Sequence, residues 1–138
     1  MQRISHVAIA TQDPEGTAKF YKEGLGLVEV GKVDSALAEG YYLSDGYINL
    51  AILKYRTDEV ATTEGAPRHA GIHHIGFSVD DMESAQAQII GAGATPHLEQ
   101  QVNAAMKAQN SLNVEYKFTG PDGVTLDLSA SGWATKTD

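Results

Sequence analysis

The sequence has no cysteine, no long apolar run and no cluster of basic residues. Without cysteine, the 138-residue chain can form neither disulfides nor thiolate–metal bonds, so any metal ion must be held by nitrogen and oxygen ligands. Its longest apolar runs are too short to cross a bilayer, and the first residues lack the unbroken apolar core of a secretory signal. We therefore expect a cytoplasmic protein with no membrane partner.

Basic residues are outnumbered by acidic ones. Ten Lys and Arg against eighteen Asp and Glu give a formal net charge of −8. A chain of this charge repels phosphate backbones, and the sequence has no stretch of Lys and Arg with interleaved aromatics to offset that repulsion. We therefore expect no nucleic-acid partner. The length suits one compact globular domain.

What the sequence does contain is a repeat. A shift of 68 positions places the stretch ISHVAIATQDPEGTAKFYKEGLGL over the stretch that begins IHHIGFSVDD, and it brings His6 over His74. Each copy reads as a strand followed by a helix, and further strand patterns come after it. We predict an α+β protein with two βαβββ modules, at about 1–56 and about 70–132. A polar linker at about 55–70 joins them within one domain.

The two predicted helices have similar start and stop signals. Asp13 and Asp81 are suited to cap the first turn of each helix. Gly24 and Gly91 can supply the left-handed residue that ends it. The second copy is longer by a segment at 103–113, NAAMKAQNSLN, which could form a short helix.

Alternation along the first strand of each copy indicates which side chains share a face. Bulky residues at alternate positions should pack against the helix and leave the other face to a histidine and small residues. His6 shares that open face with alanines, and His74 shares it with Gly76. His73 falls on the packing face with Ile75. Of the two adjacent histidines, His74 is therefore the candidate for chemistry.

An aspartate joins the histidines on the predicted open face. In VTLDLS the leucines alternate with Asp127, which leaves the carboxylate on the opposite side. Asn49 follows a DG turn as Asp127 does, so it is either a fourth ligand or a hydrogen-bonded strand amide. A single strand histidine is more often a packed residue than a ligand, but one at the same position in both copies favours a shared site.

The predicted metal site therefore consists of His6, His74 and Asp127. Two imidazoles and one carboxylate are the ligand set of non-haem iron(II) oxygenases, so Fe²⁺ is favoured; Mn²⁺, Ni²⁺, Co²⁺ or Zn²⁺ could also occupy it. Such a site suits a small, oxygen-bearing substrate.

Three stretches together resemble the vicinal oxygen chelate superfamily, which includes glyoxalases, bleomycin resistance proteins and extradiol dioxygenases. They are HVAIATQDPEGTAKFYKEGLGL, GIHHIGFSVDD and FTGPDGVTLDLS, in the superfamily's order and spacing. The resemblance implies that the paired modules curl into an open barrel of mixed β-sheet with the helices outside. It also implies a homodimer, and metal ligands at the positions of His6, Asn49, His74 and Asp127.

The chain also departs from the superfamily's pattern. Glyoxalase I and the epimerases carry Glu or Gln at the position matched by Asn49 and Glu at that of Asp127, so both side chains are shorter here. Extradiol dioxygenases place a tyrosine shortly before Pro-x-Gly, and Tyr116 stands one residue too far upstream, a shift that turns a strand side chain to the other face.

Sequence alone favours a metal-dependent enzyme of the extradiol dioxygenase type. A glyoxalase- or epimerase-like isomerase or lyase is the alternative enzyme, and a non-catalytic, ligand-sequestering resistance-type protein is the alternative without turnover. The catalytic candidates besides the metal ligands are Tyr116 and Glu39, the latter as a general base.

Overall fold

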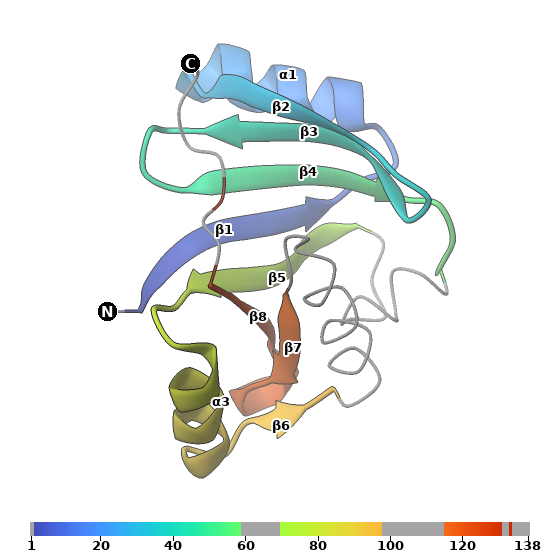
Figure 1. The fold of residues 1–138 in the computed structure, drawn as a ribbon. Helices are drawn as coiled ribbons and strands as arrows, with labels where there is room; N and C mark the ends of the chain where they lie inside the picture. Colours follow the sequence, from blue (N-terminus) through green and yellow to red (C-terminus); the bar gives the residue numbers. More distant parts are fainter. Residues whose placement is uncertain (1, 59–69, 98–114, 131–132, 134–138) are drawn as a thin grey trace.

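The computed structural model contains two similar units in one mixed sheet (Figure 1). It describes residues 2–58, 70–97, 115–130 and 133. The first unit consists of β1 (Arg3–Ala10), α1 (Pro14–Leu25), β2 (Val28–Asp34), β3 (Ala38–Ser44) and β4 (Asn49–Tyr55). The second consists of β5 (Gly71–Ser78), α3 (Met82–Gly91), β6 (Thr95–Pro96), β7 (Tyr116–Thr119), the 3-10 turn η1 (Pro121–Gly123) and β8 (Thr125–Ser129).

The eight strands lie in the order β2-β3-β4-β1-β5-β8-β7-β6. In each unit the first strand pairs in parallel with the last, and β1 and β5 pair antiparallel at the centre. The sheet curls but stays open, with β2 and β6 as its outer strands (Figure 1). This arrangement confirms the predicted α+β fold with an open mixed sheet. The helix predicted within 103–113 lies outside the described residues.

Both helices begin where the sequence predicts. The carboxylates of Asp13 and Asp81 each accept a hydrogen bond, at 3.0 Å, from the backbone N–H three residues later. These contacts satisfy amide groups that the first helical turn leaves unpaired. Neither described helix is long and apolar enough to span a membrane.

The helix ends differ from the prediction. α1 continues through Gly24, and Gly26, with a φ of 74°, adopts the left-handed conformation that ends it. α3 includes Gly91, and the left-handed residue that follows is Gly93, with a φ of 112°. In both cases a second glycine two residues further along ends the helix, because the first glycine can still adopt helical dihedral angles.

Two of the three apolar clusters among the described residues lie under the helices. α1 covers the outer face of β3 and β4, where Ala18, Leu43 and Ile52 are buried together. Under α3, Ala85 packs with Phe118 and Leu128. A third buried cluster, which includes Ala8 and Ala51, lies on the inner face of the first unit, beside the polar side chains that alternation also places there.

Two bulges interrupt the pairing of β1 with β5. Ile4 pairs with Phe77 and His6 with Gly76, so Ser5 is the extra residue of the first bulge. In the second, the pairing skips His73 between Ile72 and His74. A bulge redirects the side chain of the extra residue, and the imidazole of His73 lies against that of His74. The prediction that His73 belongs to the packing face is therefore wrong.

Candidate metal centre

Four side chains that could bind a metal ion meet on the inner face of the sheet. His6, His74, Glu115 and Asp127 each offer a ligand atom, and these atoms all lie within 4.8 Å of one another. β1, β5 and β8 carry the histidines and the aspartate, and Glu115 immediately precedes β7. The structure thus brings together the three predicted ligands and adds a carboxylate that the sequence analysis did not identify.

A glycine leaves the space in which these groups meet. Gly76 pairs with His6 on one side and with Asp127 on the other. A Cβ atom at Gly76 would collide with the His6 ring and would lie 2.5 Å from Asp127 Oδ1. Absence of a side chain at this position therefore allows an imidazole and a carboxylate to approach each other across the strand between them.

The imidazole Nε2 atoms point toward the aspartate. His6 Nε2 lies 3.4 Å from Asp127 Oδ1, and His74 Nε2 lies 3.3 Å from Asp127 Oδ2. His6 and Asp127 are fully buried, and His74 is 4% exposed. His6 Nε2 and Asp127 Oδ1 make no hydrogen bond within the part of the chain that the structure describes. Buried polar atoms of this kind are the ones that a bound ion would satisfy.

The other nitrogen of each imidazole is occupied by the residue in the adjacent bulge. His74 Nδ1 lies 2.8 Å from His73 Nδ1, and His6 Nδ1 lies 3.3 Å from Ser5 Oγ. A proton on His74 Nδ1, donated to His73, leaves the lone pair on Nε2 directed at the centre. Metal-binding histidines are commonly oriented by such a partner.

A buried lysine also enters the centre. Lys117 is 2% exposed and pairs with Asp127 in the register of β7 with β8. Its Nζ donates to Asp127 Oδ2 at 2.6 Å and to Glu115 Oε2 at 3.4 Å. The lysine thus contacts both carboxylates of the group.

The surroundings set the protonation of the predicted ligands. Burial alone would raise the pKa of Asp127, but the Lys117 ammonium and the two imidazoles together outweigh it and hold that pKa well below its usual range. Burial, reinforced by the Lys117 charge, lowers the pKa of His74 well below the ordinary histidine value. At neutral pH the centre therefore presents an ionised carboxylate and a neutral imidazole, the forms that bind metals.

The four side chains have the ligand types that a divalent ion needs, and the spacing of their ligand atoms is close to that of a bound site. Bonds from such an ion to nitrogen and oxygen are about 2.0–2.2 Å long, so ligand atoms that share one ion lie at most about 4.4 Å apart. The four ligand atoms lie within 4.8 Å of one another, so they would need to move only slightly closer together to share one ion. The donor set of imidazoles and carboxylates suits iron, manganese, cobalt, nickel or zinc.

Asn49 is not the counterpart of Asp127. Asn49 is buried and pairs with His6 itself, whereas Asp127 pairs with Gly76, two residues beyond the histidine of its strand. In the first unit the residue two beyond His6 pairs with Ala51. The equivalence of Asn49 and Asp127 is therefore wrong by two residues, and a methyl group stands where the repeat would place a fourth ligand.

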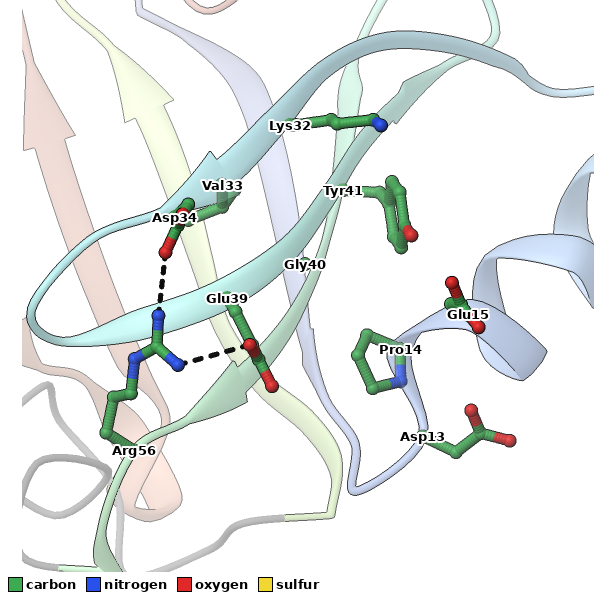
Figure 2. Close-up of a pocket in the computed structure, with 10 residues that line it drawn as sticks. All are labelled: Asp13, Pro14, Glu15, Lys32, Val33, Asp34, Glu39, Gly40, Tyr41 and Arg56. Carbon is green, nitrogen blue, oxygen red and sulfur yellow. Dashed lines mark hydrogen bonds and ion pairs between the residues drawn. The ribbon is translucent and has the colours of Figure 1, made fainter.

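Glu39 lies on the other side of the sheet. It alternates with the inward-facing residues of β3 and shares its face with Tyr41, which packs toward α1. Its carboxylate accepts from Arg56 at 3.1 Å, and Arg56 also contacts Asp34 at 2.8 Å. These residues line a hollow of about 510 Å³ beside the start of α1 (Figure 2). The structure therefore does not bring Glu39 to the metal centre.

Tyr116 is also turned away. It packs beside Phe118 and Leu128 in the core under α3, because it alternates with Lys117 along β7. The one-residue displacement seen in the sequence thus places this tyrosine on the outer face, and it is not a catalytic candidate at this centre.

Glu115 and Lys117 are the residues that the sequence analysis missed. In VEYKF the apolar side chains alternate with Glu115 and Lys117, so the pattern already places both on the open face. What the pattern does not give is the register of β7 with β8, which sets the lysine beside Asp127.

Aromatic side chains cover one side of the centre. The Trp133 indole stacks on the His6 ring with 3.8 Å between ring centroids, and Tyr42 meets the indole edge-on at 5.2 Å. Burial, together with the charge of Glu115, raises the pKa of Tyr42. Trp133 Nε1 is buried and donates no hydrogen bond to the residues that the structure describes.

Comparison with known proteins identifies one family and a common fold. A family model described as "Glyoxalase/Bleomycin resistance protein/Dioxygenase superfamily" matches residues 3–128. No curated protein matches the chain significantly.

Solved structures share the fold at low identity. A hypothetical protein from Bacillus halodurans C-125 is 18% identical, with a TM-score of 0.71 and 99% of each chain covered. A Streptomyces coelicolor methylmalonyl-CoA epimerase variant in complex with 2-nitronate-propionyl-CoA is 20% identical, with a TM-score of 0.67 over 99% of this chain and 98% of that one. A variant of 4-hydroxymandelate synthase from Streptomyces coelicolor is 15% identical, with a TM-score of 0.66 over 92% of this chain and 38% of that one.

Proposed function

The chain belongs to the Glyoxalase/Bleomycin resistance protein/Dioxygenase superfamily, and from this premise we propose that it is a divalent-metal-dependent enzyme acting on a small substrate with adjacent oxygen atoms. The observation that carries this proposal is the meeting of four ligand atoms within 4.8 Å on the inner face of the sheet. Proteins that only sequester a ligand have no need of such a group.

The residues of the centre would hold the ion and the substrate in place. His6, His74 and Asp127 are the proposed ligands. Ser5 and His73 contact the Nδ1 atoms of the two histidines, and Lys117 contacts Oδ2 of the aspartate; these contacts orient the ligands. A bound divalent ion supplies Lewis-acid polarisation of a substrate oxygen. Two carboxylates and one ammonium leave such a loaded site with a net charge of about +1, which suits an anionic, oxygen-bearing substrate.

Among the reactions of this superfamily, the geometry supports a proton transfer best. Glu115 lies among the ligand atoms but is less deeply buried than Asp127, with a side chain 23% exposed. A carboxylate at that place can take the proton from the carbon next to a polarised carbonyl and return it to a neighbouring carbon, or leave an enolate that a second proton donor protonates on the opposite face. The epimerase whose fold this chain shares catalyses a reaction of this kind by its name.

A ring-cleaving oxygenase is the second candidate. Its support is the set of two imidazoles and one carboxylate formed by His6, His74 and Asp127, which is the set used by non-haem iron(II) oxygenases. Glu115 counts against it, since a second carboxylate beside the three ligands leaves less room for both a catechol and dioxygen.

Two assays on the metal-loaded chain separate these reactions. Solvent deuterium exchange at the carbon next to a carbonyl, measured by NMR with 2-oxo acids, hydroxy-keto acids and acyl thioesters, reports proton transfer. Oxygen uptake with catechols and Fe²⁺ reports ring cleavage. We expect exchange that depends on added metal and falls at least tenfold in E115Q, with the exposed-residue variant E23Q as the matched control. Oxygen uptake without exchange would favour the second candidate.

The homodimer that the resemblance implies stays a prediction. Light scattering coupled to size-exclusion chromatography measures the molar mass in solution and would test it. A mass of one chain at micromolar concentration would contradict the prediction.

A further inference from the structure

Lys117 is a buried cation inside a group of side chains that could bind another cation. Its side chain is 2% exposed, and its Nζ lies 2.6 Å from Asp127 Oδ2 and 3.4 Å from Glu115 Oε2. An ammonium group is removed from water at a high cost unless it is paired, and a carboxylate as buried as Asp127 has the same requirement. Each of these two groups therefore depends on the other while no metal ion is present.

The oxygens of Asp127 are divided between two directions. Oδ2 accepts from Lys117 and also lies 3.3 Å from His74 Nε2, whereas Oδ1 faces His6 Nε2 at 3.4 Å and accepts no hydrogen bond from the described residues. Lys117 thus fixes the carboxylate through Oδ2 and leaves Oδ1 directed at the His6 imidazole. An ion placed among the ligand atoms would share this carboxylate with the ammonium group.

The charges at the centre indicate how Lys117 affects the affinity for a divalent ion. The two carboxylates of Asp127 and Glu115 would match the charge of a divalent ion, but with the lysine the protein's own charge at the centre is about −1. A like charge within a few ångströms of a bound ion is strongly unfavourable in a buried site, because solvent screens it little. We propose that Lys117 is a built-in counter-ion of the metal centre: it stabilises Asp127 in the metal-free chain and weakens the binding of the divalent ion.

This inference rests on the proposed function in one respect, namely that a divalent ion binds at this centre. It goes beyond that function by assigning to Lys117 a role in how tightly the ion is held. It does not depend on which reaction the enzyme catalyses, so it can be tested by metal binding and stability alone.

The test compares Co²⁺ binding by four chains that have first been freed of metal with a chelator. They are the unaltered chain, K117M, K117R and K19M. K117M removes the charge and the hydrogen bonds, and K117R keeps the charge. K19M removes one positive charge from an exposed position of α1, where the lysine side chain is 70% exposed. Calorimetric titration and the visible absorption of bound Co²⁺ give the affinity, and thermal unfolding in chelator gives the stability of the metal-free chain.

We expect K117M to bind Co²⁺ at least tenfold more tightly than the unaltered chain, while K117R and K19M stay within about threefold of it. We also expect metal-free K117M to unfold at a lower temperature than the metal-free unaltered chain. Added Co²⁺ should raise the unfolding temperature of K117M by more than that of the unaltered chain. If K117M does not fold without metal, K117Q, which keeps a hydrogen-bond donor but no charge, carries the affinity comparison with the same expected tenfold gain.

The failures of the two proposals are distinguishable. If the unaltered chain binds Co²⁺ and folded K117M or K117Q binds it equally or less tightly, the counter-ion role is overturned and the metal centre stands. If K117M binds Co²⁺ and the unaltered chain does not, the counter-ion role is supported and metal dependence of the natural chain is overturned. If none of the chains binds Co²⁺, both proposals are overturned.

Discussion

Ser5 and His73 occupy equivalent places in the two bulges between β1 and β5, and each contacts the Nδ1 atom of the histidine that follows it, at 3.3 Å and 2.8 Å. The shift that relates the two halves of the sequence also relates these two residues. The repeat thus includes an orienting neighbour for each histidine as well as the histidine itself.

Removal of the His73 imidazole should weaken metal binding without removing a ligand. In H73A the His74 ring loses the partner that fixes its orientation, and we expect a loss of roughly 10–100-fold in metal affinity. Calorimetric titration with Co²⁺ measures it. S5A, which removes the longer contact, should lose less, and an H73A affinity equal to that of the unaltered chain would contradict the orienting role.

A methyl group at Gly76 should disrupt the centre. In G76A the new Cβ meets the His6 ring and the Asp127 carboxylate, so one of them must move. We expect a destabilisation of about 1–3 kcal/mol, as for overpacking of a buried site, together with loss of metal binding.

G24A is the matched control for that change. Gly24 lies inside α1 with open space around it, so alanine should stabilise the chain by about 0.5–1 kcal/mol and leave metal binding unchanged. Chemical denaturation measures both variants. Unaltered metal binding in G76A would show that Gly76 does not make room for the centre.

Acid should destabilise the metal-free chain in two stages. The pKa of His74 is lower in the folded state than its ordinary value near 6.5, so the unfolded chain takes up this proton first and stability falls as the pH drops below about 6.5. The pKa of Asp127 is also lowered, so its contribution is present above about pH 4 and is lost as the pH falls toward its folded value.

Denaturant midpoints at pH 7.5 and pH 5.5 test the first stage. We expect the midpoint of the unaltered chain to be lower at pH 5.5, and we expect a smaller difference in H74Q, which lacks the titrating ring. Equal pH dependence in the two chains would contradict the assignment of this stage to His74.

The face of the sheet on which a side chain lies predicts whether its removal lowers turnover. E115Q should lower turnover at least tenfold, whereas E39Q and Y116F should leave turnover and metal affinity nearly unchanged, because these two residues face the helices. Steady-state kinetics with the substrate identified by isotope exchange compares the three variants. A large loss of turnover in E39Q would contradict the placement of Glu39 away from the centre.

Alternation and the internal repeat were sufficient to predict much of this molecule. They place His6, His74 and Asp127 on one face of a sheet, and the fold confirms the predicted arrangement of strands and helices. They worked because bulky and small residues alternate from His6 to the end of β1 and throughout β8, so only one face of these stretches can pack against a helix.

The errors arise where a residue breaks the alternation or where two strands must be aligned. His73 is a bulge residue, and a bulge turns a side chain out of the two-residue period. The match of Asn49 with Asp127 relied on turn positions, whereas strand register decides it. Lys117 shows no sign of its role until the hairpin of β7 and β8 sets it opposite Asp127.

The metal content of the chain tests the central claim most directly. The chain and its H74A variant are freed of metal, dialysed against equimolar Fe²⁺, Mn²⁺, Co²⁺, Ni²⁺ and Zn²⁺ under anaerobic conditions, and analysed by elemental mass spectrometry. The account predicts about one divalent ion per unaltered chain and almost none in folded H74A, because His74 is one of the few ligands of a single ion. An unaltered chain without metal, or an H74A variant that retains as much as the unaltered chain, would contradict it.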